Sequence, residues 1–136
     1  MATNVAPAQP PAREYREQEI HYVRKTVTFS DAGLAAGVRF PASLPDGALI
    51  TRTLVLIQTA FTGGTSPALT VGTAAGGSDL VAAADSVAGT VGTKRPDTAT
   101  AKGPLVGDTT PFVQVSGGPT AGVAVIVFEY APNNDG

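Results

Sequence analysis

Short runs of β-branched and aromatic residues alternate along this chain with segments rich in glycine, proline, threonine and serine. The clearest run covers residues 121–130 (AGVAVIVFEY) and follows the turn sequence GGPT at residues 117–120. A second run, residues 49–61, is closed by two glycines at 63–64. Its centre, residues 54–57 (LVLI), is apolar at successive positions, which favours a strand buried on both faces. These patterns predict buried strands joined by tight turns.

The spacing of these runs predicts an all-β fold. No long helical pattern and no alternation of strands with helices is present, so we expect a single antiparallel β-sandwich, jelly-roll-like in arrangement. Ser78 and Asp79 could cap one or two helical turns, the only helix that the pattern favours. About eight strands are predicted, at roughly residues 20–29, 34–40, 48–61, 67–73, 87–93, 104–107, 111–116 and 122–130.

Aromatic residues are scarce and fall where a core would use them. The chain has five phenylalanines, three tyrosines and no tryptophan. All the phenylalanines occupy predicted strand positions and are assigned to the core: Phe29, Phe40, Phe61, Phe112 and Phe128. Few aromatic side chains are then left for the platforms on which sugars stack.

The first residues have a different composition from the rest. Residues 1–18 (MATNVAPAQPPAREYREQ) contain three prolines among small residues and too little apolar surface to fold alone. We therefore divide the chain into an extended N-terminal arm, residues 1–18, and a β-sandwich domain, residues 19–136. Two interpretations of the arm stay open. It is either a disordered leader or a segment that becomes ordered along a neighbouring subunit, at low entropic cost.

Charge and composition exclude several classes of function. Nine basic and eleven acidic residues give a net charge of −2, so no overall field attracts nucleic acid. The absence of cysteine excludes disulfides and thiolate zinc sites. No apolar stretch approaches the roughly 18 residues of a membrane span, and no signal-peptide core precedes the domain. We expect neither a nucleic-acid partner nor a membrane partner.

Candidate catalytic residues are few. The single histidine, His21, has no recognisable nucleophile beside it, and the glycines of residues 72–77 match no phosphate-binding loop. The carboxylates that could form an acid/base pair are Asp79, Asp85, Asp97, Asp108 and Glu129. All but Glu129 lie in loops, where aspartate is the expected turn or cap residue, although Asp79 and Asp108 could join a cation site built from distant loops. We predict no enzyme activity, no cofactor and no metal site.

From about Leu54 to Tyr130 the order of turns and strands resembles a class of small β-sandwich virion proteins of tailed bacteriophages. This class comprises capsid decoration or cement proteins and related head-spike or fibre-base modules. The resemblance rests on strand and turn patterns, not on reactive residues, and covers a little over half of the chain. The matching pieces are residues 58–64 (QTAFTGG), 69–73 (LTVGT), 79–81 (DLV), 107–110 (GDTT), 112–115 (FVQV), 117–118 (GG), 120–122 (TAG) and the strand ending at 130.

The resemblance implies a structural role without catalysis. It implies a homo-oligomer, a trimer more often than a dimer, that sits on the outer capsid surface, binds the major capsid protein and bridges capsomers. Such a protein would be assembled in the host cytoplasm. On this view a sandwich face and the arm make the contacts, through Arg13, Tyr15 and Arg16 in the arm and Tyr22 and Arg24 at its junction with the sandwich.

Two other functions stay open. The chain could form the base of a head spike or tail fibre, in which case a particle would carry few copies. It could also be an adhesion module that binds carbohydrate, for which the scarcity of aromatic residues is unfavourable.

Overall fold

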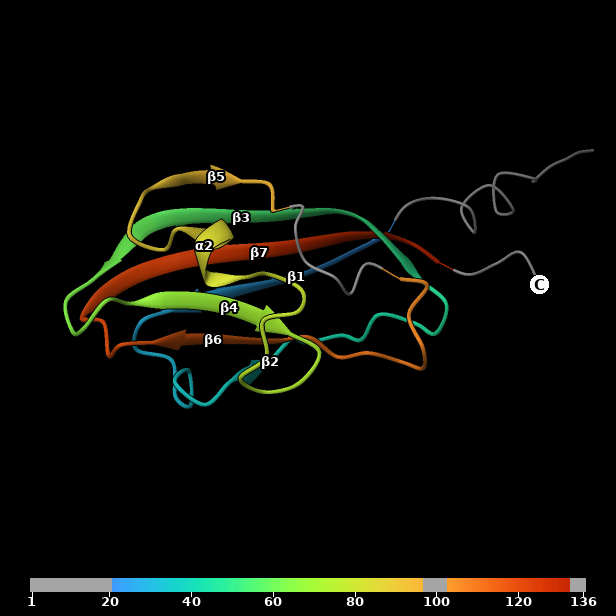
Figure 1. Cartoon of the computed structure of the whole chain (residues 1–136), viewed down its shortest axis with the longest axis horizontal. Helices are drawn as coiled ribbons and strands as arrows, with labels where there is room; N and C mark the ends of the chain where they lie inside the picture. Colours follow the sequence, from blue (N-terminus) through green and yellow to red (C-terminus); the bar gives the residue numbers. More distant parts are fainter. Residues whose placement is uncertain (1–20, 97–102, 133–136) are drawn as a thin grey trace, which may run out of the picture.

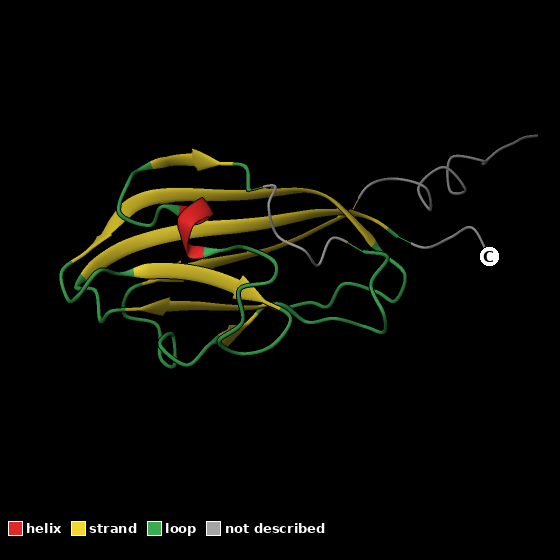
Figure 2. Ribbon diagram, viewed as in Figure 1, coloured by secondary structure: helices red, strands yellow, loops and turns green. Residues whose placement is uncertain are grey.

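The fold is a two-layered β-sandwich, seen in a computed structural model that describes residues 21–96 and 103–132. Figure 1 shows the two layers, and Figure 2 shows that strands and loops make up nearly all of the described chain. The elements are β1 (His21–Thr28), β2 (Val38–Arg39), β3 (Leu49–Thr62), β4 (Ala68–Gly72), α2 (Ala83–Ser86), β5 (Gly92–Lys94), β6 (Phe112–Ser116) and β7 (Ala121–Ala131).

Successive strands always lie in different sheets. The four-stranded sheet has the order β1-β7-β3-β5, and the three-stranded sheet has the order β2-β6-β4. All of the paired strands are antiparallel. Each of the described strands before β7 is therefore followed by one in the other sheet, as in a jelly roll, and no hairpin joins two neighbours among them. This arrangement confirms the predicted all-β sandwich.

The centre of the larger sheet is the pair formed by β3 and β7. Every residue of β1 also pairs with β7, from His21 opposite Tyr130 to Thr28 opposite Val123. The pairing of β3 with β7 shifts register at three places, which bend and twist these long strands around the core. β7 is therefore the strand that holds β1 and β3 in one sheet.

The core lies between the two sheets and is built almost entirely from aliphatic side chains. Phe40, the residue directly after β2, packs against Phe128 of β7 with ring centroids 5.5 Å apart. Val55, Ile57, Leu69, Val113 and Ile126 are fully buried. β1 alternates as a half-buried strand does, because Val23 and Val27 are buried whereas Tyr22, Arg24 and Thr26 are exposed.

Two of the predicted phenylalanine positions are wrong. Phe29, immediately after β1, is 40% exposed, and Phe112 is only half-buried. Phe112 pairs with Arg39 on the outer side of its sheet, since its neighbour Val113 points inward. Neither ring is therefore part of the buried core.

Three predicted strands are largely absent. Of residues 87–93, only Gly92 and Thr93 lie in a strand, the short β5. Residues 34–37 form a turn in which the N–H groups of Ala36 and Gly37 both donate to the Gly33 carbonyl, at 3.0 and 2.9 Å, and only Val38–Arg39 pairs. Residues 104–107 contain one buried anchor, Leu105, and no strand. Seven strands are thus present in the described part of the chain, against the eight expected.

The predicted helix is displaced from its predicted cap. It begins at Ala83, and its N-cap, Ala82, supplies no side-chain hydrogen bond. Asp79 instead accepts hydrogen bonds from the N–H and hydroxyl of Thr73, at 2.9 and 2.8 Å. The single helical turn is held by Ser86, whose buried hydroxyl donates to the Leu69 carbonyl of β4 at 2.8 Å.

Two glycine turns meet at one end of the sandwich. The turn after β3 and the turn before β7 are joined by a hydrogen bond from the Thr65 N–H to the Gly117 carbonyl, at 2.8 Å. A Cβ atom built on Gly64 would lie 1.9 Å from that carbonyl oxygen. Gly122, at the start of β7, has φ +145°, and a Cβ there would lie 2.2 Å from the Phe61 ring. These turns need glycine because backbone and aromatic ring occupy the space of a side chain.

We predict that Gly122→Ala lowers the free energy of unfolding by about 2–4 kcal/mol, from overpacking against Phe61 and from backbone strain. Urea unfolding measures the loss as a lower midpoint at unchanged slope. Gly89→Ala is the matched control, because a Cβ at Gly89 has no neighbour within 4 Å. Equal stability of the two variants would contradict the close approach of β7 to Phe61.

A second prediction concerns Thr53 on the inward face of β3. Its side chain is 2% exposed, and its hydroxyl has no hydrogen-bond partner among the described residues. Thr53→Val removes the unpaired buried hydroxyl without changing shape, so we expect the free energy of unfolding to rise by about 1 kcal/mol. Thr53→Ser keeps the hydroxyl and loses the methyl group, and should lower stability instead. A loss of stability in both variants would indicate that the hydroxyl is hydrogen-bonded.

Candidate interaction surface

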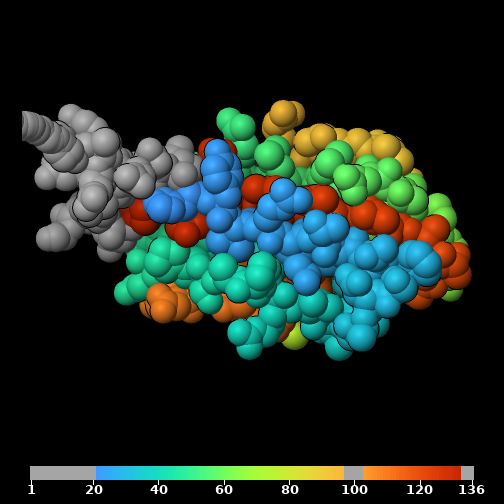
Figure 3. All heavy atoms as spheres, turned by 180° about the vertical axis from the view of Figure 1, so that it is seen from behind, coloured from blue at the N-terminus to red at the C-terminus, as the bar shows by residue number. Residues whose placement is uncertain are grey.

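The four-stranded sheet has an apolar outer side. Its inner side carries the core residues Val23, Val55 and Ile126, so alternation turns their neighbours outward. We call this side the outer sheet face and define it by Tyr22, Arg24 and Thr26 of β1, Val125 and Val127 of β7, and Leu54 and Leu56 of β3. Figure 3 shows β1 and β7 side by side at the surface of the molecule.

The apolar residues of the outer sheet face form a continuous stripe across strands. Leu54 pairs with Val127, and Leu56 pairs with Val125. Val125 is only 8% exposed although it does not belong to the core between the sheets, because its neighbours on the outer sheet face cover it. Leu54, Leu56 and Val127 are half-buried. The stripe is thus an apolar surface that the sandwich itself does not use.

The outer side of the three-stranded sheet is different in character. It presents Thr70, Gln114 and Ser116, and the Gln114 amide donates to the Ala35 carbonyl at 2.7 Å. The Ser116 hydroxyl likewise donates to the Ala68 carbonyl at 3.5 Å, so two of the three polar side chains are paired with nearby backbone. This side also carries Phe112 and Arg39. The outer sheet face differs in having two aliphatic cross-strand pairs, Leu54 with Val127 and Leu56 with Val125, beside Tyr22 and Arg24, the combination that interfaces use.

Two of the five predicted interface residues lie on the outer sheet face. Tyr22 is 64% exposed and pairs with Glu129, while Arg24 is exposed and pairs with Val127. Both belong to β1, the edge strand of its sheet. Arg13, Tyr15 and Arg16, with the whole predicted arm of residues 1–18, lie outside the described residues.

Sequence reasoning missed the apolar stripe itself. Residues 54–57 were predicted to lie in a core strand, and β3 is indeed an interior strand of its sheet. Only Val55 and Ile57 face the second sheet, and both are fully buried. Leu54 and Leu56 face the other way. The unbroken apolar run is the signal for these residues, but it fits a strand buried on both faces equally well, so the sequence alone does not place them at the surface.

The carboxylates are engaged in local structure. The Asp46 and Asp108 carboxylates brace two loops, accepting from the Gly107 N–H at 2.9 Å and the Asp46 N–H at 3.1 Å. Glu129 accepts from the Thr51 hydroxyl at 3.4 Å. The predicted loop positions are confirmed for Asp79, which accepts from Thr73, and for Asp108. The prediction is wrong for Asp85, which lies in α2, and Asp97 lies outside the described residues. Among the described residues, no three His, Cys, Asp or Glu side chains gather as a metal site would require.

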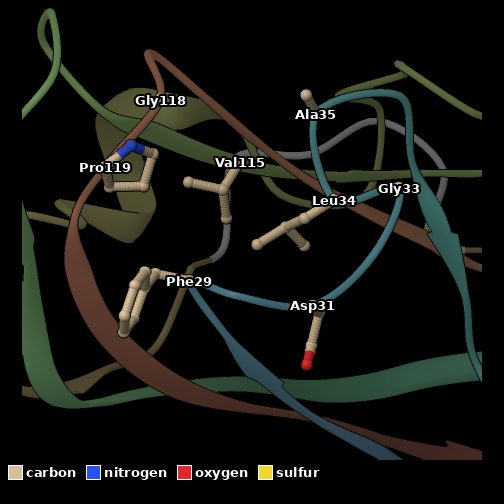
Figure 4. A pocket seen from close by; sticks show the side chains of 8 residues that line it. All are labelled: Phe29, Asp31, Gly33, Leu34, Ala35, Val115, Gly118 and Pro119. Atoms are coloured by element: carbon tan, nitrogen blue, oxygen red, sulfur yellow. The ribbon is translucent and has the colours of Figure 1, made fainter.

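A small pocket lies at the end of the sandwich where β1 and β6 finish. It has a volume of about 240 Å³ and is lined in part by Phe29, Leu34, Val115 and Pro119. Figure 4 shows these four side chains around one hollow, while the Asp31 carboxylate points away from it. That carboxylate accepts the Thr28 N–H at 2.9 Å and so holds the turn after β1.

The other end of the molecule carries an exposed valine on a braced loop. Val106 is 97% exposed, although its neighbour Leu105 is buried and exchanges backbone hydrogen bonds with Gly47 and Ala48 at 2.7 and 3.0 Å. Both chain ends of the described region lie at this end (Figure 1). No helix in the described ranges is long and apolar enough to cross a membrane.

Comparison with known proteins shows where this fold occurs. No family model and no curated protein matches the chain. A chain of the capsid of Ralstonia phage GP4 is similar, with a TM-score of 0.58 and 20% identity over 86% of this chain and 86% of that one. A chain of the cyanophage Pam1 capsid asymmetric unit has a TM-score of 0.62 and 20% identity, over 85% and 86%. This sandwich fold is thus shared with chains of two phage capsids.

Proposed function

We propose that this chain is a capsid decoration protein of a tailed phage, a cement that binds the outer surface of the head and bridges capsomers. The outer sheet face and the N-terminal arm make the contacts with the major capsid protein. The protein acts without chemistry, as a homo-oligomer, with a trimer the expected form. It is assembled in the host cytoplasm and remains in the virion.

The observation that carries this proposal is the fold shared with chains of two phage capsids. The aligned part makes up 86% of this chain and 86% of the Ralstonia phage chain, so the two chains are of similar length. A structural role in the virion is the function that this likeness favours.

The outer sheet face supports binding to a large protein surface. A sheet face that exposes Leu54, Leu56 and Val127 beside Tyr22 and Arg24 offers apolar area with an aromatic and an arginine at its rim. These residue types dominate binding energies at protein interfaces. A face spread over three strands matches a broad protein surface better than it matches a small ligand, which needs a concave site.

Bridging gains strength from repetition. Each contact by a sheet face or an arm can be modest, because the first contact made by an oligomer makes the following ones effectively intramolecular. Three subunits on two or more capsomers then dissociate only when several contacts break together. The arm suits this task because it can reach a capsomer that the sandwich does not touch.

The first test removes the arm. We expect the chain lacking residues 1–18 to fold and to keep its oligomeric state in analytical ultracentrifugation, but to be washed off phage heads in a gradient. Undiminished binding to heads would contradict a role for the arm. Copy number is measured on the same heads: hundreds of copies fit a cement, whereas a few copies fit the base of a spike or fibre.

The second test alters the outer sheet face. Leu54→Thr with Val127→Thr keeps two strand-forming residues but removes apolar surface from a cross-strand pair. We expect affinity for heads to fall by about tenfold or more, since each lost buried aliphatic contact costs about 1 kcal/mol. Val106→Ser is the matched control, because it removes an exposed valine at the end of the molecule. Equal loss in both variants would contradict binding through the outer sheet face.

A further inference from the structure

We propose that the pocket lined by Phe29, Leu34, Val115 and Pro119 binds the proline-rich segment, residues 5–11 (VAPAQPP), of another copy of this chain. This inference deepens the proposed function. On this proposal, residues 5–11 of the arm link neighbouring oligomers on the head. The part of the arm with Arg13, Tyr15 and Arg16 binds the major capsid protein.

The pocket has the chemistry that such segments need. Extended proline-rich segments dock in shallow grooves lined by aromatic and apolar side chains. Leu34 and Val115 are 5% and 2% exposed and form the base, whereas the Phe29 ring is 40% exposed and forms one wall. Pro119 is half-buried and lies above Phe29 on the same side of the view in Figure 4. An exposed phenylalanine beside a proline is the kind of surface on which a proline ring packs.

The pocket is also held open by local structure. The turn after β1 is fixed by the Asp31 carboxylate, which accepts the Thr28 N–H, and by a hydrogen bond from the Phe29 N–H to the Gly122 carbonyl at 3.0 Å. The N–H of Val115 donates to the Leu34 carbonyl at 3.1 Å. These bonds join the three segments around the hollow, so little ordering is required when a ligand binds.

The segment of residues 5–11 has the matching composition. It contains three prolines, two alanines, a valine and a glutamine, with no charge. Proline restricts the backbone to the extended form before binding, so the entropic cost of docking is small. Its small side chains suit a pocket of about 240 Å³, which would accept one or two of them at a time. Among the sequence pieces outside the described residues, this one is both apolar and proline-rich.

The direction in which β1 enters the sheet indicates that the segment comes from another copy. β1 carries the chain from His21 to the pocket end, so the arm begins about 26 Å away, at the opposite end of the strand. To reach its own pocket the arm would have to reverse just before His21. Residues 12–20 contain no Gly, Pro, Asn, Asp or Ser, the residues that form tight turns. Extended, these nine residues span at most about 30 Å, enough to reach a neighbouring molecule.

A peptide titration tests the inference without phage heads. A fluorescein-labelled peptide of residues 1–13 is titrated with the full-length chain carrying Pro7→Ala, Pro10→Ala and Pro11→Ala, so that its own arm does not compete. We expect saturable fluorescence anisotropy with a dissociation constant in the high micromolar range, typical of a short peptide in a small pocket. Phe29→Ser in the same chain should weaken binding by about tenfold or more.

Three controls make the result decisive. A peptide with all three prolines replaced by alanine should bind about tenfold more weakly, and Val106→Ser should leave binding unchanged, because Val106 lies at the other end of the molecule. Pro119→Ala provides a second pocket variant if Phe29→Ser alters the fold, which circular dichroism checks. Absence of binding at millimolar peptide, or equal binding to the pocket variants, would overturn the inference. The proposed function is tested separately, by the retention of the protein on phage heads, and neither of these results would contradict it.

Discussion

The pairing of β3 with β7 is the constraint on which the rest of the fold depends. β7 lies between β1 and β3, and β3 lies between β7 and β5, so these two strands connect every member of the larger sheet. They are separated by more than fifty residues, and every intervening strand enters the opposite sheet or the sheet edge. The fold is therefore completed only when the last strand is in place. Such long-range pairing pays a large loop-closure entropy before its contacts form.

Glycines make room for this long-range pairing of β3 with β7. β7 enters its place past the Phe61 ring, and at Gly122 no Cβ stands between ring and backbone. At the same end, Gly64 and the Gly117 carbonyl bring the turns of the two sheets into direct backbone contact. The glycines of this sequence therefore do more than form turns. They mark the points at which segments far apart in the sequence approach each other closely.

The sequence predicted the elements that depend on local preference and failed where tertiary contacts decide. Runs such as residues 121–130 are rich in β-branched and aromatic residues, and they form strands close to the expected bounds. Residues 34–37 look apolar enough for a strand, but hydrogen bonds to the Gly33 carbonyl close them into a turn, and only Leu34 enters the core. Residues 104–107 form a loop instead of the predicted strand. One buried side chain, Leu105, attaches this loop to the sandwich. Which sheet each strand joins could not be predicted, since no hairpin specifies a partner.

The outer sheet face could likewise be predicted only where local sequence preference decides. Tyr22 and Arg24 could be assigned to an exposed position, because they interrupt apolar residues in an alternating strand. Leu54, Leu56, Val125 and Val127 could not, because an apolar run is compatible with burial on both faces, and only the two-layered architecture leaves one face open. Those four residues are conspicuous in the fold because the sandwich does not need them to be apolar. Threonine would serve the strands equally well and would keep the surface polar. Their apolar character therefore calls for an explanation in binding, and a shell of many identical subunits is a partner on which a small face of this kind can be used many times over.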